Sequence, residues 1–136
     1  MLSLLEKVDL LRNTTLFQPL PTQSLVRVAA IAYELNWEPH QMVYHEGNRA
    51  ESILMVLEGE VELIRAGNVL AKIGPHQVPG ALAALSNGRH SESAVVSQPT
   101  RALRMDREEL FDAMAEDFRV AQGIVKALAG MANGAA

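Results

Sequence analysis

The chain has 136 residues, the size of one ordinary domain, and 49% of them are hydrophobic. It can therefore bury a core, and its composition is not that of a disordered segment. Its 16 acidic and 12 basic residues give a net charge of −4, and only 4% of its residues are aromatic. Proteins that bind nucleic acid use clustered cations for the phosphates and aromatic rings for unpaired bases, so we expect no direct nucleic-acid partner.

The sequence contains no cysteine, which excludes disulfide bonds, thiolate zinc sites and a cysteine nucleophile. It has no apolar run as long as the roughly 18 residues that indicate a membrane span. Its first residues lack the basic and apolar regions of a secretory signal. We therefore expect a cytoplasmic protein that does not insert into a membrane.

Helical periodicity marks the start of the chain. Apolar residues recur at helical spacing from Leu2 to about Asn13, and a second such pattern follows Thr22. Threonine is a common N-cap, so we expect Thr22 to cap the second helix. The pattern predicts N-terminal helices within residues 1–34.

From residue 35 to residue 105 the pattern changes to short, strand-like runs. Gly59 lies between two runs and is expected to form a tight hairpin turn, as is the segment 66–68. The spacing predicts about seven or eight short strands in a sandwich or small barrel. The clearest runs are Ile53–Leu57, Glu60–Leu63, Val69–Ile73, Ala94–Val96 and Ala102–Met105.

The last part of the chain is helical again. Asp106 is a suitable N-cap, and apolar residues from Phe111 to Met131 recur at helical spacing, which predicts C-terminal helices over 106–132. Small residues near the end of this segment permit close approach of another helix. Two interpretations remain: the helices pack back onto the barrel, or they form a homodimer.

One segment has the features of a binding site. Two Pro/Gly breaks lead to Gly80, which is followed by good helix formers, so we expect a short helix near residues 80–86. The free amides at its start favour an anion, and a glycine there lets a phosphate approach closely. Arg89 and His90 follow and can carry positive charge. The alternative is that Gly80 only begins a surface helix.

Five segments stand in an order that is typical of one family. They are Phe17–Leu20, Val43–Asn48, Ile53–Val61, the stretch from Ile73 to Leu85, and Leu103–Glu108. In this order the segments resemble the cyclic nucleotide-binding domain, which is found in bacterial catabolite-activator-type sensors and in kinase regulatory subunits. The resemblance runs from about Leu16 to Asp106 and continues into the terminal helices, so it covers most of the chain.

The resemblance implies a mainly β fold, an antiparallel β-roll or jelly-roll barrel with N-terminal and C-terminal helices. The whole chain, 1–136, would form one such domain, with the roll at 35–105. The function implied is that of a non-catalytic sensor or regulatory module that needs no cofactor. Its ligand would be cyclic AMP, cyclic GMP or another small anion, and binding would shift the terminal helices between two positions.

The resemblance also assigns the residues of the pocket. Backbone amides at Gly80, Ala81 and Leu82 would bind the phosphate. Arg89 and His90 would supply charge, and Ser91 a further amide.

The chain departs from the family at several of these positions. Ala81 replaces the glutamate that holds the ribose hydroxyl, and His90 replaces the phosphate-binding arginine. Glu92 stands at the position of an alanine, and His40 and His76 stand where turn glycines are usual. A methyl group cannot accept a hydrogen bond, so we expect nucleotide binding to be weakened or lost. The alternative function is a ligand-free module that dimerises or binds a partner through its C-terminal helices.

Other kinds of function find little support in the sequence. The four histidines form no His-x-His pair of the kind that metal-binding barrels use, so no metal site is expected. The chain has neither a nucleophile elbow nor a phosphate-binding loop of the nucleotide hydrolases, so we expect no enzyme. A shortened transcription factor is disfavoured by the acidic net charge and by the lack of a helix-turn-helix pattern after Met131.

Overall fold

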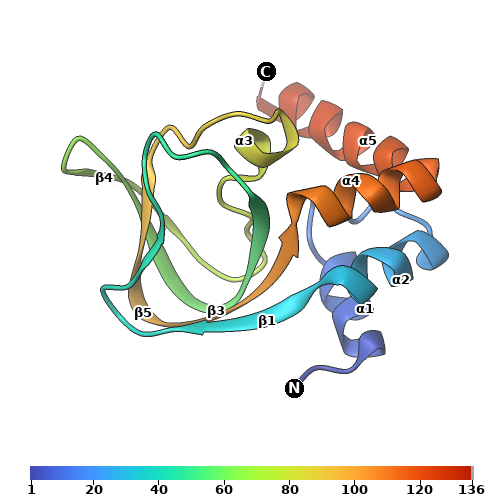
Figure 1. The fold of residues 1–136 in the computed structure, drawn as a ribbon, viewed down its shortest axis with the longest axis horizontal. Helices are drawn as coiled ribbons and strands as arrows, with labels where there is room; N and C mark the ends of the chain where they lie inside the picture. Colours follow the sequence, from blue (N-terminus) through green and yellow to red (C-terminus); the bar gives the residue numbers. More distant parts are fainter. Residues whose placement is uncertain (136) are drawn as a thin grey trace. The chain divides into compact units, whose positions relative to one another are not determined.

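The computed structural model describes residues 1–135, which divide into two compact units. One unit is Tyr33–Arg107, and the other joins the two ends of the chain, Met1–Ala32 and the residues from Glu108 onward. Figure 1 shows the helices from the two ends gathered together, although they are far apart in the sequence.

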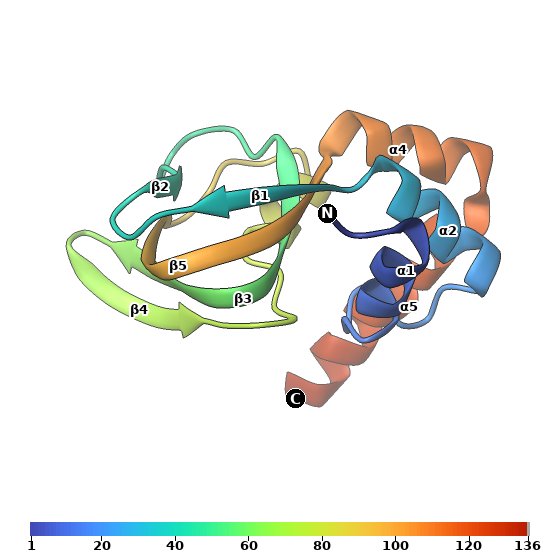
Figure 2. The ribbon, with the colours of Figure 1, turned by 90° about the horizontal axis from the view of Figure 1, so that it is seen from below.

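The first unit is an antiparallel β-roll, as predicted. Its sheet has the order β1-β5-β3-β4, and β2 pairs with β5. Every pair of strands is antiparallel. Figure 2 shows β4 beside β3 at one edge of the sheet and β1 beside β5. The elements are β1 (Tyr33–Trp37), β2 (Met42–Tyr44), β3 (Ser52–Arg65), β4 (Asn68–Ile73), α3 (Ala81–Leu85) and β5 (Ser93–Asp106).

The strands are fewer and longer than the sequence predicts. The described residues form five strands, of which β3 and β5 have 14 residues each. The predicted hairpin turn at Gly59 is wrong, because Gly59 lies inside β3 with φ +101°. A Cβ there would lie 2.4 Å from the Pro99 carbonyl oxygen and 2.4 Å from Thr100 Oγ1. The register shifts on both sides of this point, so the glycine forms a bulge where the two long strands approach closely.

The two strands predicted at 94–96 and 102–105 are likewise one strand, β5. The intervening proline predicts a break, because proline has no backbone N–H to donate to a neighbouring strand. Pro99 lies opposite the bulge, where the regular hydrogen bonding between the strands is interrupted, so β5 continues through it. The second predicted turn is confirmed, since residues 66 and 67 connect β3 to β4 and both have positive φ.

The interior of the roll is built from small apolar side chains. Val56 and Val61 of β3 pack with Ala94 and Val96 of β5, and all four are at most 2% exposed. Larger side chains that are only partly buried surround them: Trp37, Val43, Tyr44, Leu63 and Ile73.

The second unit contains four helices. They are α1 (Leu4–Arg12), α2 (Thr22–Ile31), α4 (Arg107–Glu116) and α5 (Phe118–Ala135). Thr22 is the first residue of α2 rather than its cap, and the extended Pro21 occupies the N-cap position. The predicted C-terminal stripe is therefore divided between two helices, which are separated by Asp117.

Asp117 is a buried polar hub of this unit. Its carboxylate accepts hydrogen bonds from Ser24 Oγ (2.8 Å) and from the Arg119 backbone amide (3.1 Å) and Nε (2.9 Å). These bonds, those from Arg119 first, lower the pKa of Asp117 to about 2. The ionised carboxylate thus connects α2 to the first turn of α5.

Among residues 1–135, no helix combines the length and apolar character needed to cross a membrane.

Candidate functional site

The predicted short helix is present, and Gly80 stands at its start. Gly80 is the N-cap of α3 and adopts a left-handed conformation with φ 76°. A Cβ at this position would lie 2.8 Å from His90 Cε1 and 3.2 Å from Tyr44 Cε2. Glycine is therefore required both by the backbone and by the two rings that face it.

Those two rings form a stacked pair. The ring centroids of Tyr44 and His90 are 3.6 Å apart, and the planes differ by 9°. His90 is only 7% exposed, and its backbone is held by the loop after β2: the His90 amide donates to the Asn48 carbonyl (2.9 Å), and the Gly47 amide donates to the His90 carbonyl (2.8 Å). The space directly before Gly80 is therefore occupied by the protein's own side chains.

The electrostatics of the pair oppose a positive charge at position 90. Burial lowers the pKa of His90 from its ordinary value of 6.5, and the nearby Glu92 carboxylate only partly opposes this. Glu92 accepts a hydrogen bond from the Tyr44 hydroxyl (3.1 Å). Burial, and then the Glu92 carboxylate, raise the pKa of Tyr44 well above its ordinary value. At neutral pH the stack is thus uncharged, with an anion beside it.

The other residues predicted for the pocket are scattered. Ala81 is 8% exposed, whereas Leu82 is 68% exposed. Arg89 is exposed, and its Nη1 donates to the Gly47 carbonyl (2.9 Å). Ser91 donates its hydroxyl to Glu92. The structure thus brings His90 to Gly80, but it commits the Arg89 guanidinium to another acceptor.

The start of α3 nevertheless retains unpaired donors. The Ala81 amide makes a long hydrogen bond of 3.4 Å to the Val78 carbonyl. Within the described part of the chain, the amides of Leu82 and Ala83 have no acceptor. These amides are the part of an anion site that the sequence predicts from Gly80 onward.

Sequence reasoning missed the role of Tyr44. The sequence identifies Tyr44 only as part of a strand. No local pattern predicts that its ring stacks on His90, which comes 46 positions later. The stacking follows from the pairing of β2 with β5. The two histidines at glycine-like positions do behave as expected: His40 has φ 74° and His76 has φ 69°, both left-handed.

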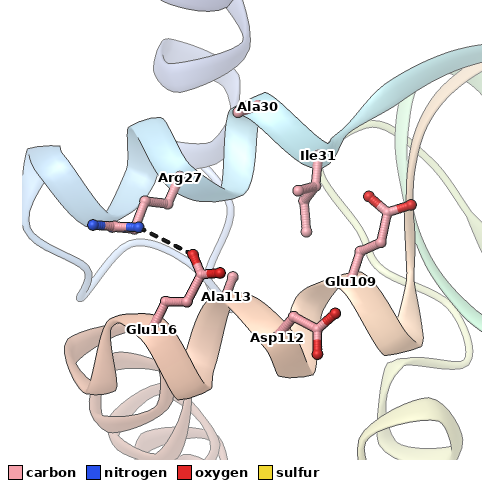
Figure 3. A pocket seen from close by; sticks show the side chains of 7 residues that line it. All are labelled: Arg27, Ala30, Ile31, Glu109, Asp112, Ala113 and Glu116. Atoms are coloured by element: carbon pink, nitrogen blue, oxygen red, sulfur yellow. Dashed lines mark hydrogen bonds and ion pairs between the residues drawn. The ribbon is translucent and has the colours of Figure 1, made fainter.

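A separate hollow lies in the helical unit between α2 and α4 (Figure 3). Its floor is apolar, and three carboxylates of Glu109, Asp112 and Glu116 surround it. Its one cation, Arg27, already pairs with Glu116 at 3.4 Å. This lining repels an anionic ligand, so the hollow is not a candidate for a nucleotide. Within residues 1–135, no three His, Cys, Asp or Glu side chains are placed so that together they could hold a metal ion.

Comparisons with known proteins agree with this architecture. Residues 34–117 match the model of the family described as the cyclic nucleotide-binding domain. The chain belongs to the cyclic nucleotide-binding domain family. This confirms the resemblance seen in the sequence.

Among curated proteins, the chain is 21% identical over 126 residues to a CRP-like cAMP-activated global transcriptional regulator of Mycobacterium tuberculosis. The match covers 89% of this chain and 56% of the regulator, so the chain spans little more than half the length of that relative.

Solved structures share the fold, for example the following two. The N-terminal domain of a transcriptional regulator from Streptomyces coelicolor A3(2) has a TM-score of 0.83 at 23% identity, with 93% of this chain and 92% of that chain covered. A regulatory subunit of a cAMP-independent protein kinase A from Trypanosoma brucei, solved as a triple mutant bound to cAMP, has a TM-score of 0.78 at 16% identity. That match covers 94% of this chain and 46% of the other.

The protonation of His90 can be measured directly. An NMR titration of its ring protons is expected to give a pKa below 6.5, because burial disfavours the imidazolium. The folded pKa then lies below the unfolded one, so His90 contributes stability above pH 6.5 that is lost as the pH falls through the folded value. The Glu92→Gln variant should lower the pKa further, since the carboxylate raises it. A pKa of His90 above 6.5 would contradict this description.

Proposed function

We propose that the chain is a non-catalytic regulatory module of the cyclic nucleotide-binding fold in which nucleotide binding is weakened. The observation that carries this proposal is the uncharged Tyr44–His90 stack directly before Gly80. A cyclic nucleotide brings a phosphate to this place, as the resemblance implies. Here the phosphate would have to displace a ring pair and would find an imidazole that burial keeps neutral.

The free-energy cost of the missing anchors is large. A hydrogen bond to a charged group contributes about 1.5–3 kcal/mol, which corresponds to roughly ten- to more than a hundredfold in affinity. Position 81 offers no acceptor for a ribose hydroxyl, and position 90 offers no guanidinium. The loss of both contacts moves a micromolar site to millimolar concentrations or beyond.

Another feature supports weakened rather than abolished binding. The amides of Leu82 and Ala83 still lack acceptors among the residues described, so part of the phosphate site remains.

A protein of the same fold provides a parallel. The Trypanosoma brucei kinase is described as cAMP-independent, and a triple mutant of its regulatory subunit has been solved with cAMP. We propose a similar relation here, in which a small number of substitutions separates weak from strong nucleotide binding.

Restoring the two anchors should therefore restore affinity. We expect the double variant Ala81→Glu/His90→Arg to bind cyclic AMP or cyclic GMP at least about a hundredfold more tightly than the unaltered chain. The increase in Tm with added nucleotide measures the effect, because a ligand at about 100 times its Kd adds about 2.7 kcal/mol.

The control is the double variant Ser86→Glu/Gln18→Arg, which introduces the same two charges at exposed positions. It should bind no better than the unaltered chain. The single variants Ala81→Glu and His90→Arg show whether each anchor acts alone. If the repaired double variant binds no more tightly than this control, the proposed reason for weak binding is wrong.

A second candidate function is dimerisation through α5. The buried side of this helix contains Val120, Ile124 and Ala127, all at most 6% exposed. On another side, Phe118 is 69% exposed and Val125 is 63% exposed. Residues seven apart lie on one face of a helix, so these side chains form an apolar stripe without a partner in the described chain. A second copy of the chain, with the same stripe, is the occupant we propose.

A charge on that stripe should separate the two copies. We expect Val125→Glu to convert a dimer to a monomer, as measured by light scattering coupled to size-exclusion chromatography, because a carboxylate cannot be buried unpaired at low cost. The matched control is Leu5→Glu on α1, where the replaced side chain is 74% exposed and lies outside the stripe. A monomeric unaltered chain, or a dimer that survives Val125→Glu, would exclude this interface.

A further inference from the structure

A polar cavity lies beside the nucleotide site in the β-roll. It has a volume of about 200 Å³ and is lined by the end of β2 and the loop that follows it, by the start of β3, by His90, and by Arg104 of β5. No residue of α3 lines it. The ring of His90 therefore separates this cavity from Gly80, and the cavity is distinct from the start of the short helix.

Two residues that line the cavity each carry a buried nitrogen atom that lacks a hydrogen-bond partner. In the part of the chain that the structure describes, these are His90 Nδ1 and Arg104 Nε. Asp106 Oδ1 lies 3.5 Å from Arg104 Nε, but this oxygen already accepts a hydrogen bond from the Tyr33 hydroxyl (3.0 Å). A buried guanidinium nitrogen without a well-placed acceptor is rare and costly, so Arg104 at the lining of a polar cavity points to a ligand with acceptor atoms.

The remaining lining favours an anion of limited size. Arg49 adds a second guanidinium, of which Nη1 donates to Asn87 Oδ1 (2.9 Å) and the other nitrogens are available. Asn48 and Ser52 add neutral donors. Glu51 contributes one carboxylate, which repels an anion from its own side of the cavity and so restricts where it can bind. Guanidinium groups bind tetrahedral oxyanions with paired, charge-assisted hydrogen bonds.

We propose that this cavity binds a small tetrahedral oxyanion, of the class of inorganic phosphate, between Arg104 and Arg49. This site goes beyond the proposed nucleotide function, because it uses neither the amides of α3 nor a nucleoside. It gives the β-roll a second ligand whose binding shares one wall, His90, with the nucleotide site.

The test is a titration of the unaltered protein with inorganic phosphate at constant ionic strength, followed by the NMR signal of the Arg104 Nε–Hε group. We expect this signal to shift and to saturate with a Kd of low-millimolar order. Arg104→Gln should weaken phosphate binding at least about tenfold in thermal melts, because it removes a charge-assisted donor. Ser52→Leu, which fills the cavity and keeps Arg104, should have the same effect if Arg104→Gln does not fold.

Arg101→Gln is the matched control. Arg101 lies on the same strand but pairs with Glu34 and Glu58, and it lines a different hollow. This variant removes the same charge and should change the phosphate Kd by less than about twofold, since only long-range attraction is altered. Adenosine monophosphate serves as the second ligand, to distinguish a free oxyanion from a phosphate attached to a nucleoside.

The outcomes separate this proposal from the nucleotide proposal. Three results would each overturn the oxyanion site. The first is an Arg104 signal that does not saturate with phosphate, and the second is an equal loss of phosphate affinity in the Arg104 and Arg101 variants. The third is a protein that binds adenosine monophosphate but not inorganic phosphate. None of these results affects the expected gain in Ala81→Glu/His90→Arg, which is measured with cyclic nucleotides. Conversely, failure of that gain leaves the saturable phosphate titration unchanged.

Discussion

The contact between the Tyr44–His90 stack and Gly80 is the interaction on which the properties of the site depend. The glycine is needed because the rings approach to within 2.8 Å of where a Cβ would lie. The rings are held in place by the pairing of β2 with β5 and by the loop that bonds the His90 backbone. One packing arrangement thus explains the left-handed start of α3, the burial of the imidazole and its lowered pKa. It is also the basis of the proposal that a phosphate binds weakly there.

The same arrangement illustrates how the family fold can be kept while residues of its binding pocket change. The β-roll depends on the bulge at Gly59 and on the small core of valines and alanines, and neither involves the ligand. Replacing a long guanidinium by an imidazole at position 90 lets the side chain stack on a neighbouring ring and become buried. A module of this kind can act through its surfaces, such as the exposed stripe of α5.

Local sequence patterns predicted the class of fold and the position of α3, because turn residues, caps and periodicity act over a few residues. They wrongly predict that β3 and β5 are each interrupted, since Gly59 and Pro99 are individually typical of turns. In the fold these two residues face each other across two long strands, and the bulge tolerates both. Which residue faces which across a sheet is a long-range property that local patterns do not contain.

The site shows the same division. Gly80, Ala81 and His90 were recognised from their positions in a familiar order, and that order also identified the missing anchors. The role of Tyr44 is not predicted, because its ring reaches the site through strand pairing rather than through proximity in the sequence. The hydrogen bond of Arg89 is not predicted either, since its acceptor is the Gly47 carbonyl on another loop.

The most direct test of the central claim is the position of the Leu82 and Ala83 amide signals in a ¹H–¹⁵N NMR spectrum as cyclic AMP is added to the unaltered protein. The account predicts that these signals move only at millimolar nucleotide, about a thousandfold above the micromolar range, and that Tyr44 and His90 keep their mutual ring contacts at lower concentrations. Saturation of both amides at micromolar nucleotide, with loss of those ring contacts, would contradict it.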